Sequence, residues 1–115
     1  MSVSIKHITF DANNPQELAE FWGKVTGQPI ENDWGKFVVL AEAKGLPRLA
    51  FYKTNDKKTV KDRVHLDLKV DDLAKESSRY VEMGARILSK HGDDKMRWYV
   101  MADPEGNEFC VSSQW

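Results

Sequence analysis

Two histidines, His7 and His65, lie about half the length of the 115-residue chain apart, and each opens a stretch that alternates like a β-strand. Each stretch leads into a helical pattern that ends at a glycine, Gly27 in the first half and Gly84 in the second. A repeat of half the chain predicts two copies of one supersecondary unit. The two imidazoles therefore occupy equivalent positions, and histidine is a residue type that recurs in functional sites.

Further polar groups share a strand face with these histidines. If Ile8 and Phe109 pack beneath the helices, their neighbours must face the other way, because adjacent side chains of a strand point to opposite sides. We therefore expect a polar set to converge inside a cleft. Its members are His7, Thr9, His65, Asp67, Glu108 and Cys110.

The elements that would position this set follow one order in both halves. A strand over 4–12 precedes a helix that Asn14 can cap and Pro15 can begin, and three short strands follow up to residue 54. In the second half, Asp71 or Asp72 can cap the helix, and strands are expected near 86–90, 96–102 and 108–112. The predicted fold class is α+β: two βαβββ repeats form a curved mixed sheet around a cleft, with one helix per repeat packed on the outer face.

The length predicts one domain over residues 1–115, because it leaves no room for a second core. The first repeat is expected at about 1–54, a polar, lysine-rich linker at about 55–63 and the second repeat at about 64–115.

Composition excludes several classes of partner. A formal charge of -1, with acids and bases mixed along the chain, provides no basic field for nucleic acid. The single cysteine excludes an internal disulfide, and no apolar run predicts a signal peptide or a membrane span. We expect a soluble cytoplasmic protein with neither nucleic acid nor membrane as a partner.

The two-fold plan, the segment HLDLKVDDL and the closing DPEGNEF resemble the vicinal oxygen chelate superfamily, and most of all its small glyoxalase-like branch. This is the group of glyoxalase I, extradiol dioxygenases and bleomycin-resistance proteins. The resemblance implies a divalent ion held by a histidine on each opening strand and a carboxylate on each closing strand. His7 and His65 match, but Cys110 stands four residues after Gly106, where relatives have a glutamate, and the other closing strand, PRLAFYKT, contains no acid.

Three hypotheses follow from this departure. First, the two histidines and the Cys110 thiolate would bind zinc. Second, Glu108 or Asp67 would supply the carboxylate of a two-histidine site for iron or nickel, or would move protons in catalysis. Third, no metal binds, and the histidines are hydrogen-bonded residues of a ligand pocket.

Aromatic residues provide a second clue, because four tryptophans are many for so small a core. An apolar wall for a flat ligand could be formed by Trp34, Phe51, Tyr52 and Trp98. Trp115, at the end of the chain, predicts a subunit contact, and we expect a homodimer.

Two functions are therefore expected. One is a glyoxalase-like protein that binds a small molecule in the cleft and acts as a metal-dependent lyase, isomerase or dioxygenase. The alternative is a metal-free protein that sequesters an aromatic drug without catalysis. A third class, an interaction module without a ligand, predicts a filled cleft.

Overall fold

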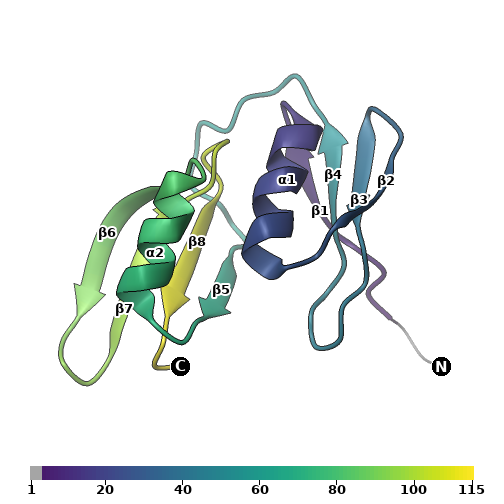
Figure 1. Cartoon of the computed structure of the whole chain (residues 1–115). Coiled ribbons are helices and arrows are strands. Elements are labelled where there is room, and N and C mark those ends of the chain that lie inside the picture. The colour runs from purple at the N-terminus through teal and green to yellow at the C-terminus, as the bar shows by residue number, and fades with distance from the viewer. Residues whose placement is uncertain (1–3) are drawn as a thin grey trace. The chain divides into compact units, whose positions relative to one another are not determined.

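The computed structural model describes residues 4–115 and contains two compact units, which divide between Lys57 and Lys58. Each unit has the order strand, helix and three strands, so the predicted βαβββ repeats are confirmed (Figure 1). The elements of the first unit are β1 (Ile8–Ala12), α1 (Pro15–Thr26), β2 (Ile30–Asp33), β3 (Phe37–Leu40) and β4 (Leu49–Lys53). Those of the second are β5 (Leu66–Lys69), α2 (Leu73–Glu82), β6 (Arg86–Gly92), β7 (Arg97–Ala102) and β8 (Glu108–Ser112).

The two sheets have the same topology. Their strand orders are β1-β4-β3-β2 and β5-β8-β7-β6, so the opening strand of each repeat is an edge strand that pairs with the closing strand. That pairing is parallel in both units, and the remaining pairings are antiparallel. The repeat predicted from the histidine spacing is therefore present in the order and the pairing direction of the strands.

Side-chain caps begin both helices. The Asn14 side chain accepts a hydrogen bond from the Glu17 N–H at 3.2 Å, and Pro15 is the first residue of α1, as predicted. At α2 the capping residue is Asp72, whose side chain accepts from the Lys75 N–H at 3.1 Å. The structure thus decides between the two aspartates that the sequence left open.

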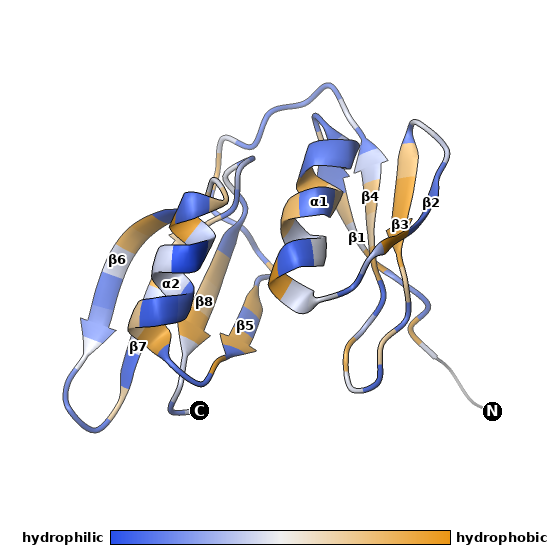
Figure 2. Ribbon diagram, in the orientation of Figure 1, coloured by the Kyte–Doolittle hydropathy of each residue, from blue (hydrophilic) through white to orange (hydrophobic). Residues whose placement is uncertain are grey.

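The core of the first unit lies between α1 and its sheet. Trp22 of α1 contacts Phe10 at a ring-centroid distance of 5.4 Å, and Phe10 contacts Phe51 at 5.3 Å. Trp22 and Phe51 are fully buried, and burial of each such side chain contributes roughly 1.5–3 kcal/mol. Figure 2 shows apolar residues along β3 and much of β4, and both apolar and polar residues along α1. These contacts define the helix-facing side of the sheet, and the other side is its open face.

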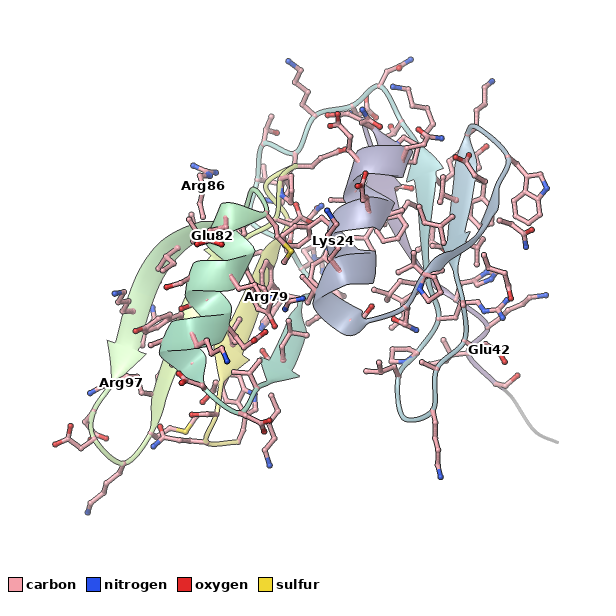
Figure 3. The ribbon with its side chains drawn as sticks, in the orientation of Figure 1. Lys24, Glu42, Arg79, Glu82, Arg86 and Arg97 are labelled. Atoms are coloured by element: carbon pink, nitrogen blue, oxygen red, sulfur yellow. The ribbon has the colours of Figure 1, made fainter. Side chains whose placement is uncertain are left out.

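The second unit is built in the same way. The ring of Tyr80 in α2 packs on that of Phe109 in β8 at a centroid distance of 6.2 Å. Burial of the Tyr80 hydroxyl is the main cause that raises the pKa of Tyr80 to about 12. Val81, the next residue of α2, is exposed. Arg79 of α2, labelled in Figure 3, pairs with Glu76 of the same helix at 2.9 Å. None of the described helices is both long and apolar enough to cross a membrane.

Candidate functional site

Three side chains that can ligate a metal meet on the open face of the second sheet. Asp67 of β5 and Cys110 of β8 are direct partners in the parallel ladder, and His65 lies two residues before Asp67 on the same face. One ligand atom from each of the three lies within 4.8 Å of the others. His65 Nε2 is 3.3 Å from Asp67 Oδ1. We call His65, Asp67 and Cys110 the HDC cluster.

The turn before β8 determines where Cys110 lies. The buried Asp103 carboxylate accepts hydrogen bonds from the N–H groups of Glu105 and Asn107, each at 2.9 Å. It also accepts from the Asn107 side-chain amide at 2.9 and 3.2 Å. The sequence DPEGN is therefore a self-satisfied turn that begins β8 at Glu108 and brings Cys110 beside Asp67.

The protonation state of Cys110 follows from its surroundings. The side chain is half-buried, and burial is the main cause that raises the pKa of its thiol. The Asp67 carboxylate raises it further, through its charge and through a hydrogen bond with the thiol. Without a cation, Cys110 is therefore a thiol and a weak nucleophile. A bound cation would favour the thiolate instead, because a coordinating thiol is deprotonated.

Glu108, predicted to act as a proton carrier or substitute ligand, has other partners. Its carboxylate accepts from the Asp62 N–H at 3.1 Å and pairs with Lys61 at 3.2 Å. In return, the Glu108 N–H donates to the Asp62 carboxylate at 2.7 Å. The Asp62 N–H is the main cause that lowers the pKa of Glu108, which makes this carboxylate a weaker base. Glu108 thus fastens the predicted linker to β8, and Asp67 is the acid that joins the cluster.

His7 belongs to the first unit. Its ring lies edge-on to that of Phe37, at a centroid distance of 5.9 Å. A metal shared between His7 and His65 stays a prediction, and the second unit provides three candidate ligands of its own.

The four predicted wall aromatics differ in their neighbours within each unit. Trp34 and Tyr52 both contact Phe37, at 6.1 and 6.0 Å. Phe51 is fully buried on the helix-facing side, because it directly precedes Tyr52 in β4. Trp98, in the second unit, stacks on His91 at 5.2 Å.

Sequence reasoning missed Phe37 as a site residue. The run Phe37–Leu40 is apolar throughout, so it lacks the alternation that reveals which side chains face outward. Its register with Tyr52 supplies that information only once the strands are paired. The strand expected near 86–90 continues to Gly92 as β6, and this extension brings His91 opposite Trp98.

Comparison with solved structures shows the same fold in proteins of low sequence identity. A glyoxalase/bleomycin resistance protein/dioxygenase family enzyme from Burkholderia phytofirmans PsJN is 15% identical, with a TM-score of 0.72 over 92% of this chain and 94% of that one. The fosfomycin resistance protein FosX from Mesorhizobium loti is 15% identical, with a TM-score of 0.74 over 96% and 92%. Lactoylglutathione lyase from Agrobacterium tumefaciens is 15% identical, with a TM-score of 0.64 over 96% and 93%.

Comparison at the level of sequence gives the family. No curated protein sequence is significantly similar to the chain. The model of the glyoxalase-like domain family matches residues 7–112, which include both histidines, the complete HDC cluster and the DPEGN turn. The chain therefore belongs to the glyoxalase-like domain family.

Proposed function

We propose that this glyoxalase-like protein is a metal-dependent enzyme for a small oxygen-bearing substrate, with His65, Asp67 and Cys110 as metal ligands. The observation that supports the proposal is the HDC cluster, in which three ligand atoms lie within 4.8 Å of one another on an accessible sheet face. Imidazole, carboxylate and thiolate are all zinc ligands, and three protein ligands with an open position are typical of catalytic zinc sites. The donor set therefore fits zinc.

The protein groups around the ligands also support this assignment. Asp67 lies 3.3 Å from His65 Nε2 and hydrogen-bonds the Cys110 thiol, so one carboxylate links the other two ligands. Glu108 is bound by Lys61 and the Asp62 N–H, so it would hold this part of the linker against β8 instead of competing for the ion. When bound, zinc would supply Lewis-acid polarisation of a substrate oxygen.

Among the structural neighbours, a FosX mutant from Listeria monocytogenes was solved in complex with Mn(II) and 1S,2S-dihydroxypropylphosphonic acid, with a TM-score of 0.77 at 12% identity. That metal belongs to that protein. A cysteine in the donor set favours zinc over manganese here, because thiolate is a softer ligand than carboxylate.

A metal titration of the purified protein tests the proposal. We expect one equivalent of zinc per chain, and an affinity at least about tenfold weaker in His65→Ala, since one of three ligands is lost. The matched control is His91→Ala, which removes the other exposed histidine of the same unit and should bind zinc like the wild type. His7→Ala in the same titration tests the predicted sharing of the ion between the two histidines.

Two results would contradict the metal site. If His65→Ala bound one equivalent of zinc with unchanged affinity, the His65 imidazole would not be a ligand. Absence of zinc, nickel and iron binding at millimolar concentration would favour the second candidate function, a metal-free binding protein. The exposed aromatics Trp34 and Tyr52 are the observation that favours this alternative.

A further inference from the structure

The open face of the first sheet carries a row of side chains that the metal site does not use. Tyr52 of β4 is the register partner of Phe37 in β3 and of Asp11 in β1. Partners in adjacent strands share a face, so these three residues form one row across the sheet. Phe51, the neighbour of Tyr52, lies in the core, which identifies the row as the side away from α1.

Trp34 extends this row at the turn between β2 and β3. Its indole is nearly parallel to the Phe37 ring, at an interplanar angle of 13° and a centroid distance of 6.1 Å. Trp34 is 65% exposed and Tyr52 is 51% exposed, whereas Phe37 is half-buried between them. We call Trp34, Phe37, Tyr52 and Asp11 the aromatic row.

The turn that presents Trp34 is held by hydrogen bonds on both sides of it. Asp33 Oδ1 accepts from the Gly35 N–H at 2.8 Å and from the Gln16 side chain of α1 at 3.1 Å. The same Gln16 amide donates to the Gly35 carbonyl at 2.6 Å. The turn is therefore tied to α1 although its tryptophan is exposed, and a fixed aromatic side chain loses little conformational entropy when it binds a ligand.

The charges around the row indicate what it would bind. Alternation directs Lys53, the neighbour of Tyr52 in β4, away from the open face, and its Nζ donates to the Asn13 carbonyl. Arg48, also in the first unit, is paired with Glu31 at 3.2 Å and with Glu42 at 3.5 Å. The exposed Asp11 is thus the charged residue in the register row that it forms with Tyr52 and Phe37.

We propose that the aromatic row binds a flat aromatic cation, which stacks on Trp34 and Tyr52 and places its positive charge near Asp11. Aromatic faces carry negative electrostatic potential and attract cations, and a neighbouring carboxylate adds to that attraction. A planar ring system also covers the exposed apolar area of both side chains. This inference goes beyond the metal site, because none of its residues belongs to the HDC cluster.

The test is a titration followed by the indole N–H signals of the four tryptophans, with N-methylquinolinium as the cationic probe and 1-methylnaphthalene as its neutral counterpart. We expect a saturable shift of the Trp34 signal, assigned from its loss in Trp34→Phe, and an affinity about fivefold higher for the cation. Asp11→Asn should abolish this preference. Trp34→Ala and Tyr52→Ala should each weaken binding about tenfold.

Trp115→Ala is the matched control, because Trp115 is also exposed but lies in the second unit. It should bind the probe like the wild type, and so should His65→Ala in the presence of EDTA, which separates this proposal from the metal site. Equal affinity for both probes, or a shift confined to Trp98 or Trp115, would overturn the proposal. A change of oligomeric state in Trp34→Ala with unchanged probe affinity would assign the row to a second copy of the chain instead.

Discussion

The Cys110→Glu variant should lose the preference for zinc and bind manganese instead. The substitution restores the carboxylate that the resemblance to metal-dependent relatives implies at the position four residues after Gly106. Carboxylates favour harder cations such as Mn²⁺, whereas thiolate with imidazole favours zinc. We expect zinc affinity to fall about 100-fold relative to manganese affinity, since one soft ligand of three is replaced.

The local structure makes this substitution a test of ligand identity. Cys110 lies at the open face and is half-buried, so a longer side chain can extend outward without entering the core beneath α2. Two carboxylates would then face each other at positions 67 and 110, because these positions are register partners. Without an ion their repulsion destabilises the site, and a divalent cation relieves it.

Competition between zinc and manganese, measured by isothermal titration for the wild type, Cys110→Ser and Cys110→Glu, checks this expectation. Cys110→Ser keeps the size of the side chain but loses the thiolate, so zinc affinity should fall without any gain in manganese affinity. If Cys110→Ser binds zinc like the wild type, the thiol is not a ligand and belongs to the packing of the sheet face.

The fold could be predicted from the sequence because two independent signals agree. The half-chain repeat gave the βαβββ order, and caps such as Asn14 gave the start of a helix. The strands were less exact. The first was expected from residue 4 but begins at Ile8, and β6 runs to Gly92, beyond the expected 86–90. Strand ends depend on pairing partners, which a local pattern does not specify.

The candidate site was predicted only in its components. His65, Asp67 and Cys110 were each named, since alternation turns all three to one face, but the sequence did not show that Asp67 is the register partner of Cys110. The network of Glu108 with Lys61 and Asp62 was missed, because polar linker residues carry no periodic signal. Asp67 therefore joins the HDC cluster, and Glu108 does not, because of the strand register and the long-range ion pair of Glu108 with Lys61.

Trp115 also makes a hydrogen bond that could not be predicted from the sequence. It was expected at a subunit contact, and within its own unit its indole N–H donates to the Leu68 carbonyl of the edge strand β5 at 3.2 Å. This bond gives the terminal residue an intramolecular partner at the strand edge where Asp67 lies. The homodimer stays a prediction.

Replacing Asp103 with alanine should destabilise the second unit by about 3 kcal/mol, because hydrogen bonds to a charged group contribute roughly 1.5–3 kcal/mol each and are not additive. The carboxylate is 1% exposed and accepts from two backbone N–H groups and the Asn107 side chain. Alanine leaves these donors without their acceptor. Urea denaturation measures the loss, and Asp103→Asn, which keeps one acceptor oxygen, should fall between alanine and the wild type.

The matched control is Asp94→Ala, which removes a fully exposed aspartate of the same unit whose ion pair with Arg97 is long, at 3.5 Å. It should change stability by no more than about 0.5 kcal/mol. Equal loss in the two variants would contradict a special role for Asp103. Under conditions in which Asp103→Ala remains folded, zinc affinity should also fall, because the turn that Asp103 closes sets the start of β8. The position of Cys110 beside Asp67, and with it the metal site, would then depend on the buried Asp103 carboxylate in the turn before β8.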